Sequence, residues 1–509
     1  MNRKKRFISN VSYNFLSQIW FMLLSLAVMP YIVHKLGIEA YAIYSVIMVV
    51  MGYLTILDLG FGAASIKYIS DFSSQDDRES LSEVVQTSLL LYLIIGLVGA
   101  LILSLSTKYL VSSVFRISKD YTSVAVTVFY IAALNFVVFM VVNFLKAILM
   151  GLQRFDLLVK SSIAIGTVLV ACQVLLLYLG FGLIQLIMLN VAVDLISIGI
   201  FWYILKGLPV NLSLKLVLNV KRLKLLWNFS AMKLLNQIST QIVFQADRLL
   251  IGIFMPISWV TYYTVPSRLS QKLMGWQGNI ANAYFPLACE LIAKGEKDKL
   301  TLVYTKLIKY VLILVLPLSI LIFVFSDTIL HLWMHGDFAE KAGTTLKLLI
   351  VSYTVAALTT VPALTLDAVG KPHITAIFSV VSAIINLVAA IILIPLYGIE
   401  GAALAFAINI FAQSPLFLIY VLRSVIKVSS FRLFVGELLR PTIAGAVLLV
   451  TYYIIKYTIS TRLYLAIGIV VGGMIYLVLI FLLKAIDEED MRILKGLNLP
   501  VIGRLIENR

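Results

Sequence analysis

Polar and basic side chains recur at helical spacing in the long apolar stretch from Trp227 to Pro286. In its first half they come every three or four residues, so at about 100° per residue they share one arc roughly 120° wide. The second half carries a similar arc of about 100°. The two arcs consist of Lys233, Gln237, Gln241, Gln245 and Arg248, then Arg268, Gln271, Lys272, Asn279 and Asn282. A cation at the centre of a bilayer costs about 2.5–3.5 kcal/mol, so we expect both arcs to face a polar interior.

The four cations of this stretch suit an anionic cargo. If the two halves are antiparallel helices, a rise of about 1.5 Å per residue spreads Lys233, Arg248, Arg268 and Lys272 through the depth of the bilayer. Arginine can hold phosphate oxygens bidentately, so this set predicts a path for an anionic head group. Two alternatives stay open: Lys233 and Arg248 can snorkel to the interfaces, and Asp247 can neutralise Arg248.

Uncharged and acidic side chains within other apolar runs extend this predicted site. The expected polar lining of the cavity consists of Asn14, Gln18, Gln237, Gln241, Gln245, Gln271 and Asn279. The carboxylates of Asp58, Asp194 and Asp247 are candidates for proton or sodium coupling, because intramembrane carboxylates are costly unless they have a function. For Asp194, a structural pair with a cation is an equal alternative.

The composition places these residues in a polytopic membrane protein. The chain has 509 residues, of which 61% are hydrophobic, and its mean hydropathy is +1.01. A soluble domain is about 45–50% apolar. The net charge of +16 is spread over short connections and forms no basic domain for nucleic acid, so positive-inside topology explains it better.

No catalytic or cofactor-binding constellation is apparent. The chain has no glycine-rich phosphate loop, and His331 and His335 lack the carboxylate motif of a metalloprotease. Cys172 and Cys289 offer neither a disulfide framework nor metal-ligand spacing. We therefore predict a transporter with no metal and no cofactor.

The apolar runs predict an all-α fold of fourteen transmembrane helices. They lie near residues 9–33, 40–65, 84–106, 122–146, 159–180, 183–205, 225–255, 258–287, 303–326, 345–366, 373–395, 399–422, 437–457 and 463–484. Lysine and arginine concentrate on alternate connections, which places both termini in the cytoplasm.

An internal repeat relates the two halves of the chain. A shift of 219 residues aligns Gln18 with Gln237 and Tyr44 with Tyr263. Six runs align with six in the same order, which predicts two six-helix lobes around a central cavity that work by alternating access. The predicted domains are the lobes 1–205 and 225–422, a basic cytoplasmic linker 206–224, two additional helices 423–484, and a cytoplasmic tail 485–509.

Five motifs together resemble the polysaccharide-export flippases of the multidrug, oligosaccharidyl-lipid and polysaccharide transporter superfamily. They are Leu36-Gly-Ile-Glu-Ala-Tyr-Ala-Ile-Tyr44, Leu57-Asp-Leu-Gly-Phe-Gly62, Gln245-Ala-Asp-Arg-Leu-Leu-Ile-Gly252, Gly370-Lys371 and Pro395-Leu-Tyr-Gly-Ile-Glu-Gly-Ala402. One departure is Ala42, which stands where the first motif commonly has a second glycine.

The resemblance implies a flippase of the bacterial inner or plasma membrane. Its substrate would be an undecaprenyl-pyrophosphate-linked oligosaccharide, moved from the cytoplasmic to the outer leaflet for O-antigen, capsule or exopolysaccharide synthesis. A polysaccharide polymerase and a chain-length regulator would be partners. Family members are thought to have cationic cavities, a role that Lys233, Arg248, Arg268 and Lys272 would fill by their character.

Three rival functions follow from the same sequence. A multidrug–cation antiporter of this superfamily would favour acidic residues in its cavity, whereas the marked arcs are basic. A flippase for a peptidoglycan lipid precursor has a similar anionic cargo. A membrane glycan polymerase would need long loops with paired carboxylates, and no predicted connection exceeds about twenty residues.

Overall fold

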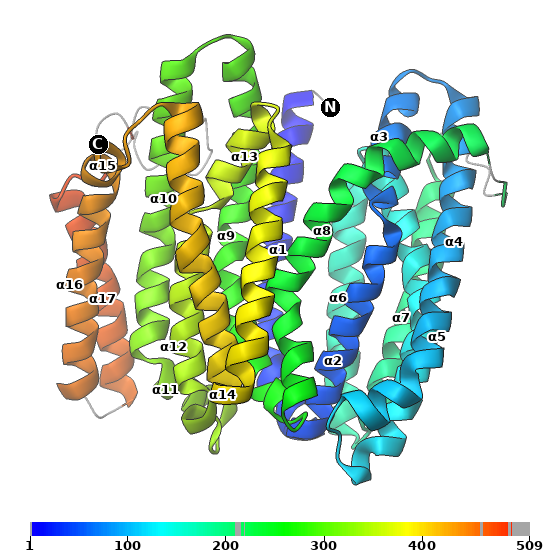
Figure 1. Cartoon of the computed structure of the whole chain (residues 1–509), viewed down its shortest axis with the longest axis horizontal. Coiled ribbons are helices and arrows are strands. Elements are labelled where there is room, and N and C mark those ends of the chain that lie inside the picture. Colours follow the sequence, from blue (N-terminus) through cyan, green and yellow to red (C-terminus); the bar gives the residue numbers. More distant parts are fainter. Residues whose placement is uncertain (1–2, 209–214, 218, 459–461, 487–489, 491–509) are drawn as a thin grey trace. The chain divides into compact units, whose positions relative to one another are not determined.

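The protein is helical in the part of the chain that the structure describes (Figure 1). The computed structural model describes residues 3–208, 215–217, 219–458, 462–486 and 490, but not the side chains of 3–19, 228–233, 236, 276–283 and 462–466. Within these residues, nine helices are long and apolar enough to cross a membrane. The predicted all-α, multi-pass membrane fold is confirmed, whereas the number of fourteen spans stays a prediction.

Contacts are dense within two units of the chain. Unit 1 consists of residues 1–265 and 379–406, and unit 2 of residues 266–378 and 407–509. The lobe boundaries expected from the internal repeat remain a prediction.

Unit 1 holds the first eight α-helices. They are α1 (Arg3–Leu36), α2 (Ile38–Leu54), α3 (Phe61–Ser74), α4 (Arg78–Tyr109), α5 (Lys119–Gly151), α6 (Phe155–Tyr178), α7 (Leu183–Lys206) and α8 (Val220–Phe254). A 3₁₀ turn, Thr55–Asp58, follows α2.

Helix α5 lies among α3, α4 and α7 in unit 1. It is apolar around most of its circumference, as expected for a helix with buried neighbours on several sides. Two glycines of α4 allow its close approach: a Cβ on Gly99 would lie 2.3 Å from the Phe136 ring, and one on Gly96 3.2 Å from the Val137 Cα. Small residues at such contacts are typical of membrane helices. Polar residues of α5 therefore sit inside the unit.

The chain breaks between α2 and α3, where the sequence predicted one continuous span over 40–65. Leu59 and Gly60 both have positive φ, of 51° and 81°. Glycine adopts this conformation without steric cost, so Gly60 permits the reversal. Asp58 then stabilises the start of α3 by accepting the backbone N–H of Gly62 at 3.0 Å. The apolar character of this stretch concealed the turn.

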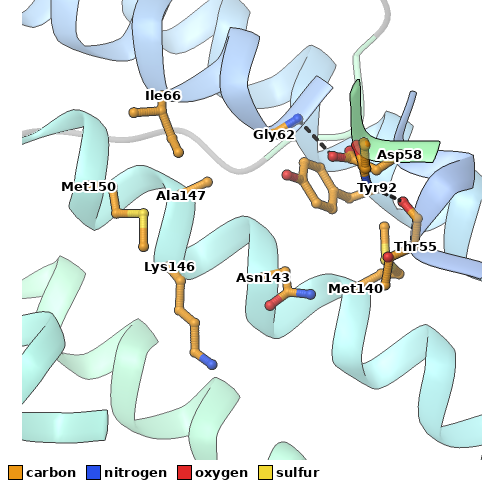
Figure 2. A pocket seen from close by; sticks show the side chains of 11 residues that line it. Thr55, Asp58, Gly62, Ile66, Tyr92, Met140, Asn143, Lys146, Ala147 and Met150 are labelled. Atoms are coloured by element: carbon orange, nitrogen blue, oxygen red, sulfur yellow. Dashed lines mark hydrogen bonds between the residues drawn. The ribbon is translucent and has the colours of Figure 1, made fainter. Parts of the chain in front are cut away.

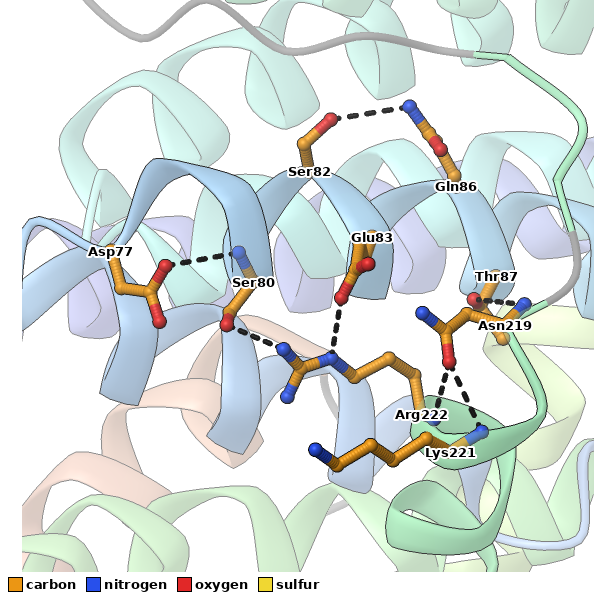
Figure 3. A network of polar contacts seen from close by, with 9 residues as sticks. All are labelled: Asp77, Ser80, Ser82, Glu83, Gln86, Thr87, Asn219, Lys221 and Arg222. Atoms are coloured by element: carbon orange, nitrogen blue, oxygen red, sulfur yellow. Dashed lines mark hydrogen bonds and ion pairs between the residues drawn. The ribbon is translucent and has the colours of Figure 1, made fainter.

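A polar network fastens the start of α8 to α4 (Figure 3). The Asn219 side chain caps α8 by accepting the backbone N–H of Arg222 at 3.2 Å, and the Asn219 N–H donates to the Thr87 hydroxyl. The Arg222 guanidinium donates to Glu83 Oε2 at 2.9 Å and to the Ser80 hydroxyl. These bonds fix the position of α8 along α4.

Unit 2 contains the later helices and most of α9. They are α9 (Trp259–Ala293), α10 (Lys297–Val324), α11 (Ser326–Met334), α12 (Phe338–Ala357), α13 (Thr360–Ala368), α14 (Pro372–Val421), α15 (Ser430–Leu433), α16 (Leu439–Thr458) and α17 (Arg462–Leu482). The predicted span 345–366 is divided between α12 and α13. Helix α14, of which 379–406 belongs to unit 1, joins two predicted spans at Gly398, whose φ of 62° and ψ of −137° are not helical.

A cluster of buried charges lies in unit 2, beside its apolar core. The ammonium groups of Lys306 and Lys309 on α10 both contact Glu437, at 3.3 and 2.9 Å, and both contact Asp490, at 3.3 and 2.6 Å. The Tyr310 hydroxyl donates to Asp490 at 2.7 Å. The cluster therefore joins α10 to the turn before α16 and to a residue that follows α17.

Candidate functional site

Two glutamines of the predicted arc on α8 bind the carboxyl end of α2. Gln237 Nε2 donates to the Thr55 carbonyl at 3.2 Å, and Gln241 Nε2 to the Gly52 carbonyl at 2.6 Å. The Tyr53 hydroxyl donates in return to the Gln241 carbonyl at 3.3 Å. Carbonyls at a helix end lack intrahelical partners, so side-chain amides stabilise this end of α2.

Gln237 also lines a cavity of about 230 Å³ inside unit 1 (Figure 2). The cavity lies where the break after α2 meets α4, α5 and α8. Its lining is Thr55, Asp58, Gly62, Ile66, Tyr92, Met140, Asn143, Lys146, Ala147, Met150 and Gln237. It thus brings together two predicted site residues, Asp58 and Gln237, with polar residues that the sequence analysis did not single out.

The carboxylate of Asp58 is held at the edge of this cavity. One oxygen, Oδ2, accepts the Gly62 N–H, as described above. The other oxygen, Oδ1, is enclosed and has no hydrogen-bond partner in the described part of the chain. The Tyr92 ring of α4 lies beside Asp58 in Figure 2. The carboxylate therefore keeps one buried oxygen unpaired among the described residues.

Helix α5 contributes an amide and a cation to the cavity. Asn143 and Lys146 are one turn apart, and Asn143 lies between Asp58 and Lys146 in Figure 2. The Lys146 ammonium is 5.9 Å from the centre of the Phe201 ring on α7. A cation over a ring face gains about 0.5–2 kcal/mol.

Asp194 of α7 interacts electrostatically with Lys146. Asn135 donates a hydrogen bond to the Asp194 carboxylate, and the Lys146 charge acts on it. Lys146 thus shares the cavity lining with one carboxylate, Asp58, and interacts with a second, Asp194. The arrangement suits both alternatives stated for Asp194, ion coupling and a structural pair.

Asp247 and Arg248 of unit 1 are both buried. Asp247 Oδ2 accepts a hydrogen bond from the Tyr263 hydroxyl at 2.6 Å. Arg248 Nη1 donates to Gln245 Oε1 at 3.0 Å, and the arginine is 5% exposed. In this conformation the guanidinium is therefore surrounded by protein, not extended to an interface.

The predicted residues of α9 belong to unit 2. Gln271 donates to the Tyr353 hydroxyl at 3.0 Å. Arg268 and Lys272 are half-buried and lie one helical turn apart. Neither has an ion-pair partner among the residues that the structure describes. The side chains of Asn14, Gln18, Lys233 and Asn279 lie outside the described residues.

Lys146 is the functional candidate that sequence reasoning missed. The apolar run was taken to end at residue 146, whereas α5 continues to Gly151. A signal was present: at 100° per residue, Asn135, Asn143 and Lys146 share an arc of about 80° on an otherwise apolar helix. The same count of about 100° per residue that identified the polar arcs of α8 and α9 identifies this polar face of α5.

Known proteins resemble this chain in sequence. A sequence profile of the family described as polysaccharide biosynthesis protein matches residues 36–341. A putative O-antigen transporter of Shigella flexneri is 22% identical over 79% of this chain and 94% of its own length. A probable low-salt glycan biosynthesis flippase of Haloferax volcanii, Agl15, is 25% identical over 53% of this chain and 57% of its own length.

Solved structures show the same fold. The lipid II flippase MurJ, in an inward closed conformation, has a TM-score of 0.71 at 16% identity, over 93% of this chain and 98% of its own. An inward-facing multidrug resistance transporter of the MATE family in the MOP superfamily also has a TM-score of 0.71 at 16% identity, over 82% of this chain and 98% of its own.

The fold, the family profile and the relatives define the class as a multi-pass membrane transporter. Because the family profile covers more than half of the sequence, the chain belongs to the polysaccharide biosynthesis protein family, whose resemblance was stated from its motifs. The predictions of a transporter and of this family are confirmed.

Proposed function

We propose that the protein moves undecaprenyl-pyrophosphate-linked oligosaccharide repeat units from the cytoplasmic to the outer leaflet of a bacterial inner or plasma membrane. The family assignment and the names of the relatives support a lipid-linked glycan as cargo. The product would serve O-antigen, capsule or exopolysaccharide synthesis, with a polymerase and a chain-length regulator acting next. Both termini would lie in the cytoplasm, and two lobes would alternate access to a central cavity.

The observation that carries this proposal is the pair Arg268 and Lys272. Both are half-buried on one helix, one turn apart, without an ion-pair partner in the described part of the chain. Like charges at this spacing repel each other, so the pair is stabilised when an anion neutralises it. A pyrophosphate supplies two negative charges, and the arginine fork can hold two of its oxygens at once.

We assign the remaining predicted residues to other steps of the cycle. Arg248 is enclosed here, so it would contact the head group in another conformation, and Lys233 would be a further contact along the path. Asp58, Asp194 and Asp247 remain the candidates for ion coupling. The membrane potential also contributes, because an anion moving outward from a negative interior gains about 2.3 kcal/mol per charge per 100 mV.

A cationic drug is a poor cargo for this site. The uncompensated cations of α9 would repel it by the same interaction that attracts a pyrophosphate. A peptidoglycan lipid precursor carries the same head group, and its fit depends on the sugar portion.

Complementation of a deletion strain tests the proposal. Deletion should cause lipid-linked oligosaccharide to accumulate on the cytoplasmic leaflet, and the wild-type gene should restore export. The double variant Arg268→Gln, Lys272→Gln keeps much of the side-chain bulk but removes both charges, so export should fall at least tenfold. Lys294→Ala, which removes an exposed cation just beyond the end of α9, is the matched control and should restore export fully. Full rescue by the double variant at wild-type protein levels would refute the proposed site.

A further inference from the structure

We infer that the unit 1 cavity is a subsite for one sugar ring of the glycan, an inference that rests on the proposed function. The polar groups of its lining are a carboxylate, two amides, a phenol, a hydroxyl and an ammonium, and two methionines and Ile66 are among its apolar members. Sugar rings present hydroxyl groups around apolar C–H faces. Carboxylates and amides can accept or exchange hydrogen bonds with such hydroxyls, and thioether and aromatic groups can cover the C–H faces.

The size of the cavity limits its occupant to a single ring. Pockets for drug-sized ligands measure about 300–1,000 Å³, so the 230 Å³ found here is too small for an oligosaccharide. A cavity of about 150 Å³ already holds a benzene ring. The space therefore suits one six-membered ring with its substituents.

The charges of the lining select a sugar over a phosphate or a metal ion. Among the described residues of the lining, Asp58 would repel a phosphate and Lys146 is the one cation. The same lysine disfavours a bound metal cation, and among the described residues no group of three metal-ligating side chains occurs. A neutral or N-acetylated sugar can donate a hydroxyl to the carboxylate and offer an oxygen to the ammonium. Opposite charges at separate points of the lining thus match an uncharged polar ligand.

The geometry around Asp58 supports the same assignment. The Gly62 N–H fixes the Asp58 carboxylate at the edge of the cavity, so the side chain is positioned before a ligand arrives. Gln237 completes the lining from α8, where its bond to the Thr55 carbonyl holds it in place. A ring bound here would contact α4, α5 and α8 together.

Binding of five defined lipids to the purified full-length protein in nanodiscs tests the inference. The probes are undecaprenyl diphosphate without a sugar and the same lipid with a single glucose, galactose, N-acetylglucosamine or N-acetylgalactosamine. Competition with a fluorescent undecaprenyl diphosphate analogue gives each affinity. At least one sugar should increase affinity about tenfold or more, as expected when a hydrogen bond to a charged group forms.

Two variants separate the sugar contact from the lipid contact. Asp58→Asn and Asn143→Ala should each remove most of this increase while leaving the sugar-free lipid within about twofold of wild type. Asn143→Ala leaves the Asp58–Gly62 bond intact, so it answers the question even if Asp58→Asn disturbs folding. Asp76→Asn, at an exposed carboxylate, is the control.

Three results would overturn the inference. They are no gain from any of the four sugars, an undiminished gain in both variants, and an equal loss of affinity for the sugar-free lipid. Failure of all five lipids to bind the wild-type protein has a different meaning, because it refutes the proposed diphosphate-lipid cargo itself.

Discussion

Asp490→Asn should destabilise unit 2 strongly, although the residue follows α17, the last helix with described bounds. Asp490 is fully buried, and its carboxylate contacts Lys309 at 2.6 Å, Lys306 at 3.3 Å and the Tyr310 hydroxyl at 2.7 Å. Removing one partner of a buried ion pair costs about 3–5 kcal/mol, because the remaining charge loses its compensation. Glu437 still contacts both lysines, so we expect a loss near the lower end, about 3 kcal/mol.

Unfolding of the purified protein by SDS in mixed micelles, followed by circular dichroism, measures this loss. The control is Glu290→Gln, which breaks a lysine–carboxylate contact whose two side chains are each 58% exposed and should cost at most about 1 kcal/mol. The double variant Lys309→Met, Asp490→Leu removes both members of an ion pair. Its loss in the free energy of unfolding should be smaller than the sum of the losses in the two single variants. A cost below about 1 kcal/mol for Asp490→Asn would show that the cluster is solvated and would refute the reasoning.

Two further predictions concern the start of α4 and of α8. Arg222→Met should lower the free energy of unfolding by about 1–2 kcal/mol in the same assay, because the hydrogen bonds to Glu83 and Ser80 are lost. Lys221→Met, at the neighbouring exposed lysine, should leave the free energy of unfolding unchanged. Equal effects of the two variants would contradict the role of this network. Hydrogen bonds from the Ser80 hydroxyl and N–H hold the pKa of Asp77 below its usual range. The ionised Asp77 carboxylate therefore stabilises the protein above about pH 4, and this stabilisation is lost as the pH falls through the lowered pKa. Asp77→Asn keeps a side chain that can cap α4 but removes the titrating carboxylate, so its free energy of unfolding should fall less than that of the wild type between neutral and acid pH. Parallel pH profiles of the free energy of unfolding for the two proteins would contradict this role of Asp77.

The positions of most membrane helices were predictable because hydropathy is a local property of the chain. The predicted runs 84–106 and 159–180 lie within or almost within α4 and α6, and the predicted gap between 373–395 and 399–422 contains the non-helical Gly398. The break at Leu59 and Gly60 was not predictable from hydropathy, because its residues are as apolar as the helices around it. Its conformational signal was one glycine after Asp58.

The side-chain partners were harder to foresee than the helices. Asp58 was predicted as a candidate for ion coupling, but the sequence does not show that Tyr92, Asn143 and Gln237 line the same cavity. The Asp490 cluster likewise joins residues far apart in the chain. Hydropathy finds segments that enter a bilayer, whereas a polar site depends on which faces of those segments meet, and no local pattern specifies that.

Lysines near the ends of apolar runs show where sequence analysis of such proteins can improve. Lys146 closes the run 122–146, and Lys306 and Lys309 lie near the start of the run 303–326, yet all three sit on helices that extend at least a turn further. A span needs only about 20 residues, but α5 has 33 and α10 has 28, so a charge near the end of a run is still inside a helix. Its surroundings then depend on the face that it shares: Lys146 shares its face with two asparagines at a cavity, whereas Lys306 and Lys309 are one turn apart and face two carboxylates. Placing such terminal lysines on the same helical wheel as the run would have identified Lys146 from the sequence.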